Sequence, residues 1–124
     1  MCGISGAISP GFWVGKSHAE DVTKRMSDAL AHRGPDGSGC FVDMANGVTL
    51  GHRRLAIIDA EHGHQPMIHR ETGIVLVFNG EIYNFKDLKA ELLALGHRFI
   101  TESDTEVLLL SYIQWGDKCF QRLL

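Results

Sequence analysis

The second residue of the chain is a cysteine, within the opening stretch MCGISG. Removal of Met1 would leave Cys2 as the terminal residue, with a thiol and an α-amine on one α-carbon. A thiol with a pKa of about 8.5 and an amine with a pKa of about 7.7–8.0 combine a nucleophile and a base in one residue. A cysteine is more often a small apolar core residue. The rest of the chain must decide between these two interpretations.

Other residue types that could take part in such chemistry follow later. Asn79 and Gly80 end the apolar run 74–78 and offer a side-chain NH2 and a backbone N–H, which are donors that stabilise an oxyanion. The same pair is common in turns. Arg53 and Arg54 are adjacent, so in a strand they point to opposite faces and only one can enter a given pocket. Spacing does not say which one.

Acidic residues could bind an ammonium group, but each also has an ordinary structural interpretation. Glu81 is of a type that usually lies on the surface. Asp104 follows Ser103, where a carboxylate stabilises the first turn of a helix.

A metal site is the alternative interpretation from another class of protein. His62, His64 and His69 lie within eight residues of one another. No cysteine or acidic pair completes a tetrahedral zinc set at a known spacing. We therefore expect solvated loop histidines and no metal.

The composition limits the class of protein. The 124 residues are 44% hydrophobic and 22% charged, with a formal net charge of -3, as in one globular domain. The sequence contains no stripe of basic residues that would indicate nucleic-acid binding, and none of its apolar runs is long enough to cross a membrane. The three cysteines have no metal or redox spacing, and no signal peptide is evident, which together favour a cytoplasmic protein.

Periodicity predicts the first elements. We expect a strand over 2–9 and then a helix that begins with the capping box Ser17 and Glu20 and ends before Gly34. The apolar stripe of this helix consists of Ala19, Val22, Met26, Ala29 and Leu30. Strands over 38–43 and 48–58 flank Asn46-Gly47, which is a strong hairpin signal.

The second half alternates in the same way. We expect a polar loop over 59–73, a strand over 74–78, a helix over 84–95 capped by Asn84, and a short strand over 98–101. Ser103 and Glu106 form a second capping box that opens a helix ending at Trp115. Mixed elements with a hairpin predict an α+β fold. The apolar tail, which contains Cys119, Phe120, Leu123 and Leu124, suggests a chain truncated at its C-terminus.

Five motifs occur in one order: MCGISG at 1–6, HRGPDG at 32–37, GHRRLAIID at 51–59, FNGEIYN at 78–84 and SDTEV at 103–107. This set resembles the glutaminase domain of class II glutamine amidotransferases, in the asparagine synthetase branch. The resemblance implies the αββα four-layer sandwich of N-terminal nucleophile hydrolases. It covers residues 1–124 as an incomplete glutaminase domain and implies a synthetase domain that this chain lacks.

The resemblance also implies roles for individual residues. Cys2 would attack the side-chain amide of glutamine and form a thioester, while Asn79 and Gly80 would form the oxyanion hole. The resemblance selects Arg54 over Arg53 as the clamp for the substrate carboxylate. The remaining substrate-binding residues that it implies are Leu55, Ala56, Ile57, Ile58, Glu81 and Asp104.

The resemblance further implies that the released ammonia amidates aspartate. ATP and Mg²⁺ would act in the missing synthetase domain, and no cofactor is expected in residues 1–124. Three alternatives stay open: an amidotransferase with a sugar or peptide acceptor, a relative that has lost turnover, and the metal-binding module of His62, His64 and His69. A homo-oligomer is a further open question.

Overall fold

The computed structural model describes residues 1–56 and 63–124. They form two compact units. The first comprises Met1–Ala56, His64–Pro66 and Val77–Asn79, and the second contains Met67–Leu76 and Gly80–Leu124. Both units mix α and β structure, as the sequence predicted. Among the described helices, none has the length and hydropathy that a membrane span requires.

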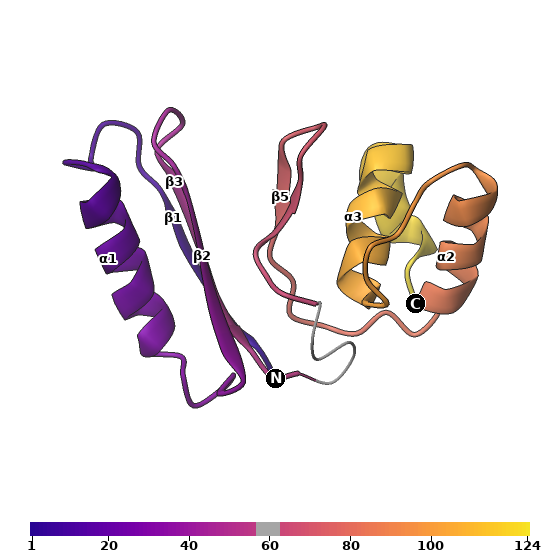
Figure 1. Ribbon diagram of the computed structural model, residues 1–124, viewed down its shortest axis with the longest axis horizontal. Helices are drawn as coiled ribbons and strands as arrows, with labels where there is room; N and C mark the ends of the chain where they lie inside the picture. The colour runs from indigo at the N-terminus through magenta and orange to yellow at the C-terminus, as the bar shows by residue number, and fades with distance from the viewer. Residues whose placement is uncertain (57–62) are drawn as a thin grey trace. The chain divides into compact units, whose positions relative to one another are not determined.

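The first unit is a three-stranded antiparallel sheet covered on one face by a helix (Figure 1). Strands β1 (Gly3–Ile8) and β2 (Gly37–Asp43) both pair with the central strand β3 (Val48–Arg54). The register places Ile4 and Gly39 on either side of His52. The predicted strands are confirmed in outline, although β3 ends at Arg54 and residues 57 and 58 lie outside the described residues.

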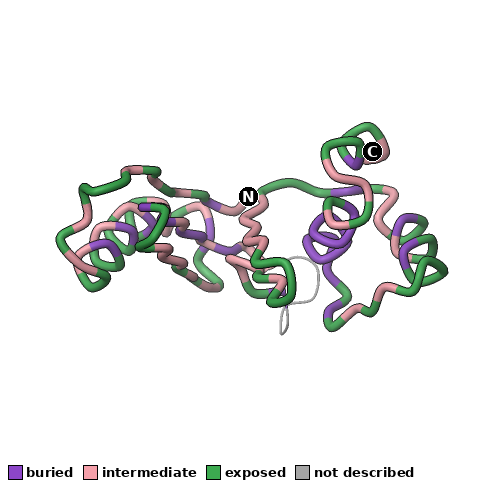
Figure 2. Tube along the Cα trace, turned by 90° about the horizontal axis from the view of Figure 1, so that it is seen from above, coloured by how far each residue is buried: buried purple, intermediate pink, exposed green. Residues whose placement is uncertain are grey.

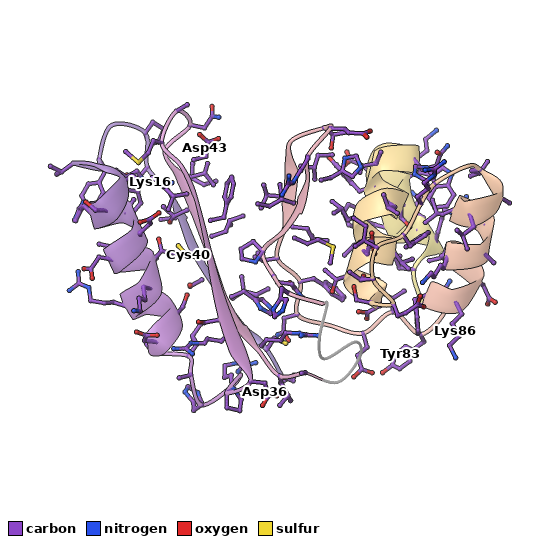
Figure 3. The ribbon with its side chains drawn as sticks, viewed as in Figure 1. Lys16, Asp36, Cys40, Asp43, Tyr83 and Lys86 are labelled. Carbon is purple, nitrogen blue, oxygen red and sulfur yellow. The ribbon has the colours of Figure 1, made fainter. Side chains whose placement is uncertain are left out.

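The turn between β2 and β3 is the predicted Asn46-Gly47 hairpin. Gly47 has a φ of 65°, in the left-handed region that favours glycine. The Asp43 carboxylate accepts hydrogen bonds from the backbone N–H groups of Ala45 and Asn46, at 3.0 and 3.2 Å. An aspartate in this position closes the turn through its side chain, and Figure 3 shows Asp43 at this tip.

Helix α1 (Lys16–Asp28) differs from its predicted cap and stripe. The helix begins at Lys16 after Gly15, so Ser17 lies inside it and the predicted capping box is wrong. The buried positions are Ala19, Thr23 and Ser27, whereas Val22 and Met26 are only half-buried. Small side chains allow close approach: a Cβ at Gly51 of β3 would lie 2.1 Å from the Ser27 hydroxyl. Close packing of small side chains, and not hydropathy, therefore determines which face of α1 is buried.

The second unit contains a hairpin that the sequence did not predict. Strand β4 (Met67–His69) falls within the expected loop and pairs with β5 (Ile74–Leu76). β5 is also shorter than the predicted 74–78. Three residues are too few to produce a periodic signal, so β4 is defined only by its pairing with β5.

Helices α2 (Phe85–Ala94) and α3 (Asp104–Trp115) match the predicted spans closely. Gly96 and Gly116, just past their ends, have φ values of 95° and 57°. α3 is buried almost throughout its first two turns, as the purple tube in Figure 2 shows. The Ser103 side chain accepts a hydrogen bond from the Glu106 N–H at 3.3 Å, which confirms the predicted cap. The second half of the predicted capping box does not form, because the Ser103 N–H donates to the Thr101 hydroxyl at 3.2 Å.

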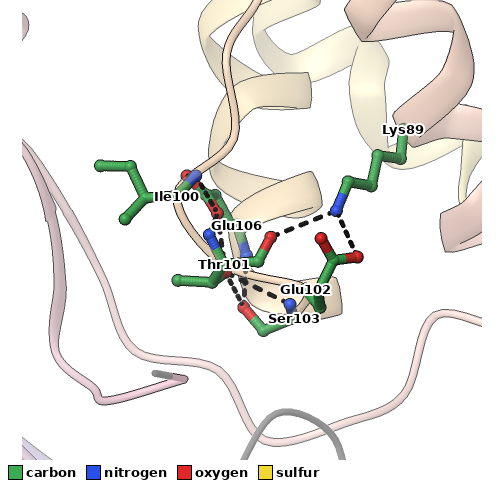
Figure 4. A network of polar contacts seen from close by, with 6 residues as sticks. All are labelled: Lys89, Ile100, Thr101, Glu102, Ser103 and Glu106. Carbon is green, nitrogen blue, oxygen red and sulfur yellow. Dashed lines mark hydrogen bonds and ion pairs between the residues drawn. The ribbon is translucent and has the colours of Figure 1, made fainter. Parts of the chain in front are cut away.

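Residues 98–101 do not form the predicted strand. The backbone N–H groups of Ile100 and Thr101 instead donate to the Glu106 carboxylate, at 2.9 and 2.6 Å (Figure 4). The Thr101 hydroxyl donates to the same carboxylate at 2.7 Å. A buried side chain therefore satisfies backbone groups that a strand partner would otherwise bind.

The chain after α3 forms a 3₁₀ helix, η1 (Gly116–Arg122). Asn84 binds this segment: its side-chain nitrogen donates to Arg122 O at 2.8 Å, and its oxygen accepts from the Leu124 N–H at 3.0 Å. No cap hydrogen bond forms from the Asn84 side chain to α2. Cys119 is buried, whereas Phe120 and Leu124 are exposed.

Candidate active site

Cys2 directly precedes β1, and its side chain belongs to the sheet face that points away from α1. A Cβ at Gly3 would lie 2.8 Å from Leu30 Cβ, so Gly3 faces the helix side and its neighbour Cys2 faces the other side. The Leu55 N–H donates to Cys2 Sγ at 3.3 Å, and the thiol lies 3.7 Å from Leu55 O. The half-buried thiol is thus held against the backbone that follows β3.

The HRGPDG loop at 32–37 forms hydrogen bonds with the chain at the start of β1 and at the end of β3. Arg33 Nε donates to Cys2 O at 3.2 Å. The Asp36 N–H donates to Arg54 O at 2.9 Å, and the Asp36 carboxylate accepts from the Ala56 N–H at 2.9 Å. Figure 3 labels Asp36 at the end of the sheet where the chain begins. The motifs at 1–6, 32–37 and 51–56 therefore meet around Cys2.

Gly34 allows this loop to lie against β3. A Cβ at Gly34 would lie 2.4–2.6 Å from the backbone atoms of Arg53 and Arg54. No side chain fits there without a backbone shift, so the glycine in the motif has a steric function as well as its turn chemistry.

Arg53 and Arg54 have opposite surroundings. Arg53 Nε donates to Ser27 O at 3.3 Å, and its guanidinium forms an ion pair with Asp28, both in α1. Arg54 is buried and belongs to the face of Cys2, because side chains alternate along β3. This arrangement leaves Arg54 as the arginine that shares a face with the thiol. Its contact with a substrate carboxylate stays a prediction.

The predicted acidic residues lie in the second unit. Asp104 is buried in the first turn of α3, and its carboxylate accepts from the Ile82 N–H at 3.2 Å. This bond ties the chain just after Glu81 to the start of α3. Glu81 itself is exposed. The predicted position of Asp104 in the first turn of a helix is confirmed, and its role toward an ammonium group stays a prediction.

The predicted oxyanion donors are consecutive residues that fall in different units. Asn79 belongs to the first unit and Gly80 to the second, and both are exposed. Leu55 and Ala56 are placed beside Cys2 and Asp36 by the hydrogen bonds above. Ile57 and Ile58 lie outside the described residues.

Sequence reasoning missed two residues beside this site, His52 and Gln65. His52 Nε2 lies 3.2 Å from Phe78 O, and Gln65 Oε1 accepts from the Phe78 N–H. Burial lowers the pKa of His52 below 6.5; the Phe78 carbonyl acts against this shift, and the charge of Arg54 adds to it. The alternation that separates Arg53 from Arg54 could have placed His52 on the face of Arg54.

The other two cysteines differ from Cys2 in their surroundings. Partial burial and the nearby Glu20 carboxylate raise the pKa of the Cys40 thiol. Burial and Asp117 raise the pKa of Cys119. A raised pKa reduces the fraction of reactive thiolate, so neither thiol is a good nucleophile at neutral pH.

The described residues contain no cluster of three histidine, cysteine or acidic side chains that could hold a metal ion. His62, one of the three histidines of the alternative site, lies outside the described residues. His69 Nδ1 lies 2.9 Å from the Thr72 hydroxyl, within the β4–β5 turn.

Similarity to known proteins decides the family. The profile of the family described as "Glutamine amidotransferase domain" matches residues 1–124. The chain belongs to this family. It is 43% identical over 125 residues to asparagine synthetase [glutamine-hydrolyzing] 3 of Bacillus subtilis, and 41% identical over 123 residues to asparagine synthetase [glutamine-hydrolyzing] 1 of the same organism. Each alignment covers 99% of this chain.

Asparagine synthetase [glutamine-hydrolyzing] 2 of rice is 43% identical over 95 residues, which cover 75% of this chain and 15% of the rice protein. This amidotransferase domain spans 20% and 19% of the length of the two Bacillus subtilis relatives. The expected glutamine amidotransferase family is therefore confirmed. The activity of a longer protein belongs to the proposal below.

Proposed function

We propose that this domain hydrolyses the side-chain amide of glutamine through a thioester on Cys2. The observation that carries the proposal is the position of the thiol. It is held by the Leu55 N–H at 3.3 Å, on the sheet face to which Arg54 belongs. A nucleophile and a buried cation on one face suit a substrate that carries both an amide and a carboxylate.

The reaction would proceed in two steps. After removal of Met1, the α-amine of Cys2 takes the thiol proton, and the thiolate attacks the amide carbon. The Asn79 side chain and the Gly80 N–H donate to the oxyanion that forms. The amine then gives its proton to the leaving nitrogen, so that ammonia departs and a thioester remains. Water hydrolyses the thioester to glutamate and restores the thiol.

The charged ends of glutamine would be bound by opposite charges. The Arg54 guanidinium can donate two parallel hydrogen bonds to the α-carboxylate. Glu81 and Asp104 would bind the α-ammonium group. The backbone of four residues would line the pocket, namely Leu55, Ala56, Ile57 and Ile58.

In the longer protein, the ammonia would amidate aspartate in an ATP-dependent reaction that yields asparagine. The Bacillus subtilis relatives are about five times as long as this chain. Their name, asparagine synthetase, supports aspartate as the acceptor. ATP and Mg²⁺ would act in a C-terminal synthetase domain, in the cytoplasm. A sugar or peptide acceptor is the alternative, and asparagine formation from aspartate by the full-length protein separates the two.

We also propose that the domain has the αββα four-layer fold. Supporting this, α1 covers one face of the sheet β1–β3–β2, and α3 contacts the β4–β5 hairpin. Each unit thus contains helix packed against β structure, as each half of such a sandwich would. A crystal structure of the full-length protein that lacks this layer order would contradict the fold.

The test uses the full-length protein and its Cys2→Ala variant. Wild-type protein should lack Met1 by intact mass, release ammonia from glutamine, and react once with a diazoketone analogue of glutamine. Cys2→Ala should release none and stay unlabelled, yet still bind glutamine in calorimetry. Cys40→Ala is the matched control and should behave as wild type. An active wild-type enzyme that retains Met1 would contradict this mechanism.

A further inference from the structure

We propose that His52 and Gln65 are positioning residues that hold the backbone of Phe78 and thereby fix the oxyanion donors that follow it, Asn79 and Gly80. This inference rests on the proposed function, because it assigns a task to residues around the same site. Neither His52 nor Gln65 has a role in the reaction steps above.

The two side chains bind the two polar backbone groups of Phe78, its carbonyl and its N–H. His52 Nε2 lies 3.2 Å from Phe78 O, and Gln65 Oε1 accepts from the Phe78 N–H at 2.5 Å. A carbonyl oxygen can only accept, so His52 donates from Nε2 and carries its proton there. The carbonyl of Phe78 belongs to the peptide group that ends at the Asn79 nitrogen. Holding this peptide plane therefore fixes the direction in which Asn79 starts.

The surroundings of His52 restrict the movement of its ring. Its side chain is fully buried, and its Nδ1 has no hydrogen-bond partner among the described residues. Among the residues that the structure describes, the hydrogen bond that holds the ring is therefore the one to Phe78. A buried polar side chain with one half of its bonding capacity unmet is costly, which suggests a role other than stability.

The register brings this contact close to the nucleophile. His52 lies opposite Ile4 in β1, and Cys2 is two residues before Ile4 on the same face of the sheet. Two residues of a strand span about 7 Å. The bond from His52 therefore holds Phe78 over the part of the sheet where the thiol lies.

Gly39 allows the backbone of Gln65 to lie close to β2, because it has no side chain. It is the other neighbour of His52 in the sheet, and a Cβ at Gly39 would lie 1.9 Å from Gln65 O. The backbone of Gln65 therefore rests directly on the α-carbon of Gly39. Any side chain at position 39 would displace Gln65 and loosen its bond to Phe78.

The chemical benefit is preorganisation. Oxyanion donors act by already pointing at the place where charge develops, and loss of one donor lowers the rate about 10²–10³-fold. A displacement of about 1 Å can cost about 10²-fold. Asn79 and Gly80 are exposed and lie outside any helix or strand, so their own secondary structure does not hold them.

The test compares steady-state glutaminase kinetics of full-length variants. His52→Leu should lower kcat about 10- to 100-fold and change KM less than about twofold, because the donors act in the transition state. His52→Gln keeps a donor near the Nε2 position and should recover most of this loss. Thr49→Val is the matched control: Thr49 is equally buried in the same strand, and its kcat should not change.

Two further variants keep the test valid if His52→Leu fails to fold. Gln65→Met removes the acceptor for the Phe78 N–H, and Gly39→Ala displaces Gln65, so each should lower kcat with little change in KM. In an Asn79→Ala background, His52→Leu should cost much less than in wild type, because the two changes remove the same interaction.

The outcomes separate the two proposals. Wild-type ammonia release together with unchanged kcat in the folded His52→Leu, Gln65→Met and Gly39→Ala proteins would overturn only the positioning role. Full additivity of His52→Leu and Asn79→Ala would also overturn it. Absence of ammonia release from the wild-type protein would overturn the proposed function, and this inference with it.

Discussion

At the scale of single residues, two adjacent arginines have different tasks. Arg53 is bound by the Ser27 carbonyl and the Asp28 carboxylate at the end of α1. Arg54 lies buried on the opposite face, with its backbone carbonyl fixed by the Asp36 N–H. The two residues therefore offer a matched pair of substitutions that remove the same charge from two faces of one strand.

We expect Arg54→Ala to raise KM for glutamine at least about 10-fold, because a bidentate contact to the carboxylate is lost. Arg53→Ala should leave KM near the wild-type value and lower the free energy of unfolding by about 1 kcal/mol or less, since its ion pair is partly exposed. Ammonia-release kinetics and urea unfolding measure both. If Arg53→Ala raised KM and Arg54→Ala did not, the assignment of the carboxylate clamp would be wrong.

His52 predicts a pH dependence of stability. Burial lowers its pKa in the folded state below the ordinary value of 6.5, so the unfolded chain binds the proton more readily. The contribution is complete above about pH 6.5 and is lost as the pH falls through the folded-state pKa. Urea unfolding from about pH 7.5 to about pH 5 should show a decline that is smaller in His52→Gln. Equal slopes in both proteins would contradict this prediction.

At the scale of elements, the Glu106 carboxylate holds the segment that leads into α3. Glu106 is buried and accepts hydrogen bonds from the backbone of Ile100 and Thr101 and from the Thr101 hydroxyl (Figure 4). Asp104, two residues earlier, binds the Ile82 N–H. The network therefore fixes both the segment before α3 and the turn that presents Asp104.

Glu106→Ala should lower the free energy of unfolding by about 2–3 kcal/mol, because buried donors lose a charged acceptor. Glu102→Ala is the control. Glu102 is 83% exposed and pairs with Lys89 at 2.7 Å, so its loss should cost at most about 1 kcal/mol. Chemical denaturation of both variants measures the difference. Equal losses would show that the buried network contributes no more than a surface ion pair.

At the scale of the whole molecule, the domain spans about a fifth of its Bacillus subtilis relatives. Residues 1–124 contain no Ser-Gly-Gly-x-Asp-Ser loop of the kind expected to bind ATP. We therefore expect the isolated residues 1–124 to bind no ATP, make no asparagine and hydrolyse glutamine poorly. Exposed Phe120 and Leu124 should also favour self-association.

This prediction is tested by expressing residues 1–124 beside the full-length protein. ATP binding, ammonia release and oligomeric state by size-exclusion chromatography are compared at equal concentration. A monomeric fragment with the turnover of the full-length protein would show that the expected boundary of the domain is wrong.

The sequence by itself determined the features that depend on local chemistry. Asn46-Gly47 predicted the β2–β3 hairpin because glycine accepts a positive φ at low cost. Ser103 predicted the start of α3, because its side chain caps a free backbone N–H. The five motifs predicted the amidotransferase family.

Tertiary structure decided the features that depend on distant partners. β4 exists because it pairs with β5, and 98–101 is not a strand because Glu106 binds its backbone. The contact of His52 and Gln65 with Phe78 joins residues 26 and 13 positions apart. Hydropathy and turn signals describe only neighbours along the chain, whereas a buried hydrogen bond depends on which group the fold brings within reach.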